Sequence, residues 1–375
     1  MRAVIRSVAV ATVVLTGSAY AGDITTSATY TGEVLRNVAG GVRRATVYLG
    51  NLDVDAQWHP GNNEHLTTYV HLLVDHGEKP SDFVGDAQGV SNIAAPDAMR
   101  VYEAWVDYDV GMFGVRAGVY DLNTEFDVTP DGGLFSNSSF GITPEFSQGG
   151  PLGPSIFPYT GLAVRARTES DGNYLQFAVL DGMPGDKKDP RKPNFHLSKQ
   201  EGVLLVSEVG RAAKTQSGSE YKIAAGVWHF TADFERIKSG ASQQGNSGAY
   251  ALADGVIGQW ETASLSGFLQ VGIADDRVNG IANYVGAGLV VSGFLNSRPK
   301  DRVGLALARA KFSDDARDAD GLLSAETAIE LNYEMPINEW FTLQPNVQRV
   351  IHPSGDPSLK NAWAIGARFI LSYSN

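Results

Sequence analysis

The chain has 375 residues, of which only 19% are charged, and its formal net charge is −12 at pH 7. This acidity argues against a nucleic-acid partner, whose phosphates would be repelled. Cysteine is absent, which excludes disulfide bonds and thiolate metal sites. The 42 glycines, 14 tyrosines and 16 phenylalanines favour strands and turns. We therefore expect a nearly all-β fold.

The first 21 residues predict a cleaved secretory signal. Arg2 and Arg6 precede an apolar stretch at 8–15, and the segment ends in small residues. A retained membrane anchor is the alternative, but the apolar stretch is too short to span a bilayer as a helix. We expect a mature chain of residues 22–375 that forms one domain. Its net charge becomes −14, because both charges of the signal segment are arginines.

Alternation of apolar and polar residues predicts long strands along the mature chain. In residues 45–58, Tyr48, Leu52 and Val54 oppose Asn51 and Asp53. The same alternation recurs at 327–335, 341–348 and 363–375. Outside the signal, no apolar run approaches the roughly 18 residues that a transmembrane helix needs.

Two kinds of protein show this alternation: a soluble β-sandwich or barrel, and a membrane barrel whose apolar face points outward. Sandwich strands usually have about 5 to 6 residues. Here alternation persists for about 8 to 13 residues, close to the 9 to 11 that a tilted strand needs to cross a bilayer. Aromatic residues near strand ends, such as Trp58, Trp340 and Tyr373, suit the interfacial girdles of a membrane barrel. We therefore expect a transmembrane antiparallel β-barrel.

Short and long connections are expected to lie at opposite ends of this barrel. Residues 109–116 and 335–340 predict tight hairpins on the periplasmic side. Longer polar stretches predict extracellular loops at 77–97, 121–159, 181–201, 238–248 and 313–322.

Five blocks of the chain resemble, in family order, the OprB family of carbohydrate-selective porins. They are residues 32–58, 117–147, 153–167, 177–186 and 340–355. The resemblance implies an outer-membrane barrel of roughly 16 strands. It also implies that sugars, glucose above all, pass through the channel by passive diffusion.

The segment 121–159 carries several phenylalanines in what reads as a long loop. A segment this apolar is expected to pack against the inner wall of the barrel and to narrow the lumen. The expected constriction residues are Phe135, Asn137, Phe140 and Phe146. The alternative is a loop that caps the outer rim or meets a neighbouring subunit.

Alternation also assigns the side chains that face the lumen, because inward and outward residues alternate along a barrel strand. In residues 101–110, Tyr102, Ala104 and Val106 are expected to face lipid. The expected lining combines charges with aromatic rings, so that hydroxyls and C–H faces of a sugar both find partners. It consists of Asp53, Asp55, Tyr69, Glu103, Trp105, Asp107, Arg116, Tyr120, Arg165 and Arg167. For each charge, the alternative is a solvated wall residue without effect on selectivity.

Two other functions have to be weighed against a sugar channel. A general or cation-preferring diffusion pore would use similar strands and would suit the acidic net charge. For an enzyme, we find no nucleophile elbow, zinc-binding His-Glu-x-x-His pair, phosphate-binding loop or dinucleotide fingerprint. We expect no catalytic residue, no cofactor and no metal site. The expected partners are small sugars, the lipid bilayer and lipopolysaccharide, and the sequence leaves monomer and homo-oligomer open.

Overall fold

The computed structural model describes residues 24–186, 189, 200–215 and 218–375. The expected signal segment at 1–21 and most of the second half of the expected loop at 181–201 lie outside the described residues. None of the helices in the described residues is long and apolar enough to cross a membrane.

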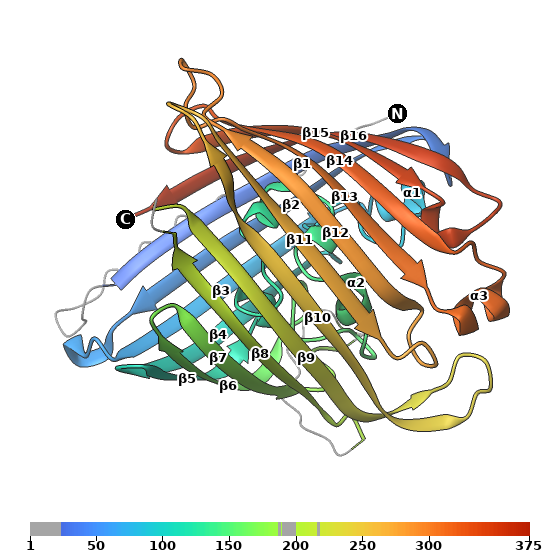
Figure 1. Cartoon of the computed structure of the whole chain (residues 1–375), viewed down its shortest axis with the longest axis horizontal. Coiled ribbons are helices and arrows are strands. Elements are labelled where there is room, and N and C mark those ends of the chain that lie inside the picture. The colour runs from blue at the N-terminus through green and yellow to red at the C-terminus, as the bar shows by residue number, and fades with distance from the viewer. Residues whose placement is uncertain (1–23, 187–188, 190–199, 216–217) are drawn as a thin grey trace.

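Across the described residues, sixteen antiparallel strands close into one barrel (Figure 1). Consecutive strands pair with each other, and β1 closes the barrel against β16, so the barrel has no free sheet edge. Hydrocarbon offers no partner for an unpaired N–H or C=O, and closure is how strands satisfy both in a membrane. The predicted fold class is confirmed. The strands are β1 (Ile24–Gly41), β2 (Ala45–Trp58), β3 (Leu66–Gly77), β4 (Ala98–Val110), β5 (Phe113–Tyr120), β6 (Gly161–Ser170), β7 (Asn173–Asp181), β8 (Val203–Lys214), β9 (Glu220–Glu235), β10 (Ser242–Gln259), β11 (Ser264–Ala274), β12 (Ile281–Ser292), β13 (Arg302–Phe312), β14 (Ala325–Pro336), β15 (Phe341–Ile351) and β16 (Lys360–Ser374).

The connections at the two ends of the barrel differ in length, as expected. The hairpins β4–β5 and β14–β15 are short and match the turns predicted at 109–116 and 335–340. The opposite end carries the connections that hold the short helices, and we take it as the extracellular end. These helices are α1 (Ser81–Val84), α2 (Pro144–Ser147) and α3 (Asp314–Asp320), with 3-10 turns η2 (Leu122–Thr124), η3 (Asp131–Leu134), η4 (Ser138–Phe140) and η5 (Pro353–Gly355); η1 (Pro60–Asn62) lies at the periplasmic end.

The prediction of a loop at 238–248 is wrong for most of that segment. Strand β9 continues to Glu235 and β10 already begins at Ser242. Gln243, Gln244 and Asn246 are therefore strand residues, with a bulge between the last two. This hairpin carries polar residues on both of its faces, so it lacks the alternation that marks the other strands.

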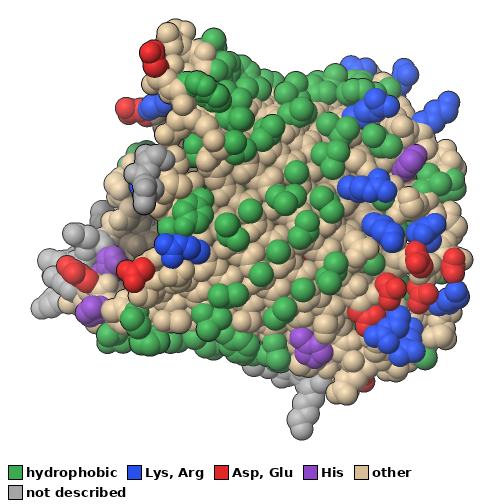
Figure 2. Space-filling view, viewed as in Figure 1, with side chains coloured by type: hydrophobic (Ala, Val, Ile, Leu, Met, Phe, Trp, Pro, Cys, Tyr) green, Lys and Arg blue, Asp and Glu red, His purple; other side chains and the backbone are tan. Residues whose placement is uncertain are grey.

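Apolar side chains face outward and polar ones inward, which is the inverse of a soluble protein. Leu305 and Ile273 are 57% and 58% exposed on the outer wall. Glu330 and Gln348, which point inward, are fully buried. Figure 2 shows hydrophobic side chains spread over the visible wall. Such an apolar outer band fits hydrocarbon rather than water.

One facing assignment is wrong because β4 contains a β-bulge. His71 of β3 pairs with Glu103, but the next residue, Leu72, pairs with Val101, which leaves Tyr102 without a partner. A bulge places two consecutive residues on the same side of a sheet. Tyr102 consequently points inward next to Glu103, is buried and donates a hydrogen bond to Asp121, instead of facing lipid.

Candidate solute pathway

The long connection between β5 and β6, residues 121–160, lies inside the barrel (Figure 1). We call it the channel loop. The ring of Phe146 stacks on Trp228 of β9, with centroids 5.1 Å apart and planes 5° from parallel. Phe135 and Phe140 contact Phe268 of β11, with centroid distances of 5.9 and 5.8 Å. Phe135, Phe140 and Phe146 are all buried, so they attach the loop to the wall.

Polar contacts hold the same loop on β14 and β15. The backbone N–H groups of Ser136 and Asn137 donate to the two carboxylate oxygens of Glu330, at 2.7 and 2.9 Å. The Asn137 side chain donates to Gln348 at 3.2 Å. A buried carboxylate that accepts two backbone N–H groups is a strong anchor. Asn137 is buried as well, so the four residues expected at the constriction all hold the loop against the wall.

The connection between β3 and β4 also folds inward and covers another part of the wall. The backbone N–H groups of Ala87 and Gln88 donate to Glu326 of β14, at 2.8 and 3.1 Å. Gln348 of β15 donates to the carbonyl of Val90 at 2.7 Å. The contacts of the two inward loops with the wall include β1, β7–β12 and β14–β16. The inner surface of β2–β6 carries half-buried charged and aromatic side chains, among them Asp53, Tyr69, Trp105, Arg116 and Arg167.

Three side chains form a stacked row across β3, β4 and β5. The ring of Tyr69 stacks on Trp105 with centroids 4.9 Å apart, and the Arg116 guanidinium lies 3.7 Å from the Trp105 ring centroid. Gly118 pairs with Trp105 across β4–β5 at a φ of 142°, a conformation that favours glycine. All three side chains of the row are half-buried and accessible from water.

Arg116 of this row and the buried Arg165 behind it share two carboxylates. Arg116 contacts Asp107 at 2.7 Å, and Arg165 contacts both Asp107 at 3.1 Å and Glu125 of the channel loop at 2.8 Å. Burial by itself would raise the pKa of the Glu125 carboxyl, but Arg116 and Arg165 hold that pKa below its usual value. The network therefore keeps opposite charges paired and fixes the orientation of Arg116.

Further charged side chains extend this surface on both sides. His71 lies 2.9 Å from Asp53 and 3.9 Å from Glu103. Arg167 on β6 contacts Glu169 at 2.7 Å, and its guanidinium lies 4.5 Å from the ring centroid of Tyr174. The wall thus offers both donors and acceptors of hydrogen bonds beside aromatic faces.

The ten lining residues expected from the sequence lie on adjacent strands, β2 to β6, but in two layers. Half-buried and open to water are Asp53, Asp55, Tyr69, Trp105, Arg116 and Arg167. Buried behind them are Glu103, Asp107, Tyr120 and Arg165. Sequence reasoning missed Glu125, because it lies in a loop where no alternation predicts the direction of a side chain.

The comparisons with known proteins bear on the family and the fold of the chain. The family model described as "Carbohydrate-selective porin, OprB family" matches residues 43–373. The chain belongs to this family. Porin B of Pseudomonas aeruginosa is 24% identical over 312 residues, which cover 72% of this chain and 67% of that protein. A high-pH structure of OprB from Pseudomonas putida has a TM-score of 0.83 at 20% identity and covers 93% of this chain and 94% of its own. OmpT of Vibrio cholerae, solved in a trimer form, has a TM-score of 0.56 at 10% identity, with 94% and 100% covered.

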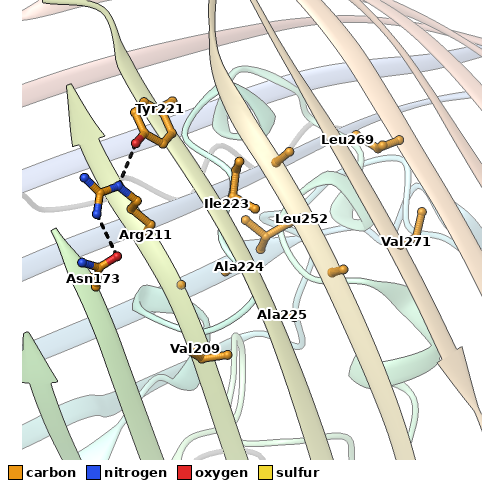
Figure 3. A pocket seen from close by; sticks show the side chains of 13 residues that line it. Asn173, Val209, Arg211, Tyr221, Ile223, Ala224, Ala225, Leu252, Leu269 and Val271 are labelled. Carbon is orange, nitrogen blue, oxygen red and sulfur yellow. Dashed lines mark hydrogen bonds between the residues drawn. The ribbon is translucent and has the colours of Figure 1, made fainter. Parts of the chain in front are cut away.

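Family and fold make the chain a porin of the bacterial outer membrane. A groove of about 630 Å³ on its wall lies away from the solute pathway (Figure 3). Its outward-facing side chains include Val209, Ile223 and Leu269, which are 58%, 58% and 47% exposed. At one end of the groove, Arg211 donates to Tyr221 and Asn173, each at 2.8 Å. In this porin the groove faces lipid, so it is not a site for a water-borne solute.

Proposed function

We propose that this porin passes glucose-type monosaccharides by passive diffusion, and that the row of Tyr69, Trp105 and Arg116 contacts the sugar. The observation that carries the proposal is the stacking of an arginine on an aromatic pair in a part of the lumen that water reaches. A sugar presents C–H groups on its faces and hydroxyls around its rim. Aromatic rings suit the faces, and charged donors and acceptors suit the rim.

The arrangement of the lining residues in a front layer and a buried layer supports weak and rapid contacts with the sugar. The front layer offers Asp53 and Arg167 as further hydrogen-bonding groups, while buried Arg165 and Asp107 hold Arg116 in place. A solute passes quickly only if hydrogen bonds to water are replaced step by step and no single site binds too tightly. Arg116 is already paired with Asp107, which limits how strongly it can hold a sugar.

The proposal is tested with liposomes that contain the wild-type porin or the variant Arg116→Gln or Trp105→Ala. Entry of glucose, sucrose, an amino acid and phosphate is followed by swelling. A hydrogen bond to a charged group contributes about 1.5 to 3 kcal/mol, so the apparent affinity for glucose should fall roughly tenfold or more in Arg116→Gln. Trp260 is 62% exposed in the β10–β11 turn, so Trp260→Ala serves as the control and should leave glucose entry unchanged.

Two outcomes would contradict the proposal. If the wild-type porin admits all four solutes at rates that depend on size alone, the channel is a general diffusion pore. If glucose is preferred but both variants retain that preference, the sugar contacts another part of the wall. A preference for cations over neutral sugars would favour the cation-selective alternative, for which the acidic net charge is the argument.

A further inference from the structure

Four cationic side chains point away from the lumen near the extracellular ends of their strands. They are Arg36 on β1, Arg309 and Lys311 on β13, and Arg349 on β15, and we call them the cationic strip. All four are exposed, and they alternate with buried inward residues such as Leu35, Ala310 and Val350. They therefore lie on the outer wall of the barrel, where the membrane surrounds it.

Strand register places three of these cations along one line. Arg36 pairs with Ile365 and Arg349 with Trp363, two residues apart on β16. Arg349 also pairs with Ile329 and Arg309 with Thr327, two residues apart on β14. Neighbouring cations on this line are thus separated by two strand spacings across the sheet and by two residues along the strands, a distance of about 12 Å. Barrel strands tilt, so a regular offset of this kind runs around the barrel at a similar depth in the membrane.

Among the described residues, the recorded contacts of the strip are with neutral side chains. Arg349 lies over the ring of Trp363 at 5.2 Å, and Arg309 donates to the hydroxyl of Thr327 at 3.3 Å. Within the residues that the structure describes, no ion pair joins any of the four cations to a carboxylate. The outward positions of β13–β16 and β1, all of them described, carry no Asp or Glu. Figure 2 shows Lys and Arg side chains at this end of the wall, with a group of Asp and Glu side chains beside some of them.

The wall next to the strip, toward the middle of the barrel, is apolar. Leu305 and Leu307 precede Arg309 on the outer face of β13, and Ile365 lies opposite Arg36. Their exposed fractions are 57%, 39% and 47%. An amphipathic molecule that lies along this wall can bury acyl chains against the apolar residues while its head group reaches the cations.

We propose that the cationic strip binds the phosphate groups of lipopolysaccharide in the outer leaflet. Guanidinium groups bind phosphate through paired N–H donors, and unpaired cations at a membrane surface attract anionic lipid. The chain as a whole is acidic, so a row of unpaired cations on this one face does not follow from overall composition. The leaflet decides the partner, because the strip lies at the extracellular end, where a phosphorylated glycolipid faces the porin.

The test compares lipid binding by the full-length porin and by the triple variant Arg36→Gln, Arg309→Gln, Arg349→Gln. Purified proteins in detergent are titrated with lipopolysaccharide, with dephosphorylated lipopolysaccharide and with phosphatidylglycerol. Each cation at a membrane surface contributes roughly a fivefold gain in affinity, so the triple variant should bind intact lipopolysaccharide roughly a hundredfold more weakly. Arg211→Gln is the matched control: it removes an outward-facing arginine near the periplasmic end of β8 and should change nothing.

The proposal predicts that dephosphorylation weakens binding to the wild-type porin as much as the triple substitution does. Equal binding of intact and dephosphorylated lipid would overturn it, as would unchanged binding by the triple variant. Phosphatidylglycerol bound as tightly as lipopolysaccharide would overturn the choice of partner. Liposome swelling confirms that each variant still forms a channel, because none of these residues faces the lumen.

Discussion

Replacing Phe146 by alanine should loosen the channel loop while leaving the barrel closed. Phe146 is fully buried and stacks on Trp228, 5.1 Å away, and on Tyr250, 6.0 Å away. Truncating a buried phenylalanine costs about 3 to 5 kcal/mol. Since about 1.4 kcal/mol changes an equilibrium tenfold, the population of undocked loop should rise more than about a hundredfold. The strand ladder is unaffected, because its hydrogen bonds do not involve this side chain.

The assay is amide hydrogen exchange in detergent, read by mass spectrometry over residues 121–160, together with single-channel conductance. Exchange in the loop should accelerate by the same factor, exchange in the strands should not change, and mean conductance should increase. Phe177 is 44% exposed on the lipid side of β7, so Phe177→Ala is the matched control. Loop exchange that stays at the wild-type rate in Phe146→Ala, or rises equally in Phe177→Ala, would refute the role of this ring as an anchor.

Two further predictions concern the same loop. Glu330→Gln leaves one acceptor oxygen for the two N–H groups of Ser136 and Asn137, so docking of the loop should weaken by about 1 to 3 kcal/mol. Amide exchange at 134–138 should therefore become faster. Unchanged exchange there would show that the carboxylate is not needed for docking. Burial raises the pKa of Glu145 to about 8 and that of Asp127 to about 7, from ordinary values of 4.5 and 3.8. The docked loop therefore binds protons more tightly than the undocked loop, so this contribution to docking is complete below about pH 4 and is lost as the pH rises toward 8. The protection of the loop amides, taken relative to their intrinsic base-catalysed exchange rates, should therefore fall over this range, and less so in Glu145→Gln. Protection that does not change with pH in the wild type would contradict the argument.

The alternation of residue types by itself determined the wall of this protein. An extended chain turns successive side chains to opposite faces, so an apolar residue at every second position marks the outward face before any contact is known. This local rule assigned Asp53, Tyr69, Trp105, Arg116 and Arg167 to the lumen, and it does not depend on which strands become neighbours. The short hairpins followed for the same reason, because turn residues and strand ends are adjacent in sequence.

The tertiary structure decided what non-local contacts control. Only strand pairing shows that β4 bulges at Tyr102 and turns this ring inward. Only the path of the channel loop brings Glu125 against Arg165 and buries that arginine, so that it supports Arg116 and does not face water. Alternation predicts the side of the sheet on which a residue lies, but not which other residues bury it. Burial depends on contacts between residues far apart in the chain, and only the closed barrel brings those residues together.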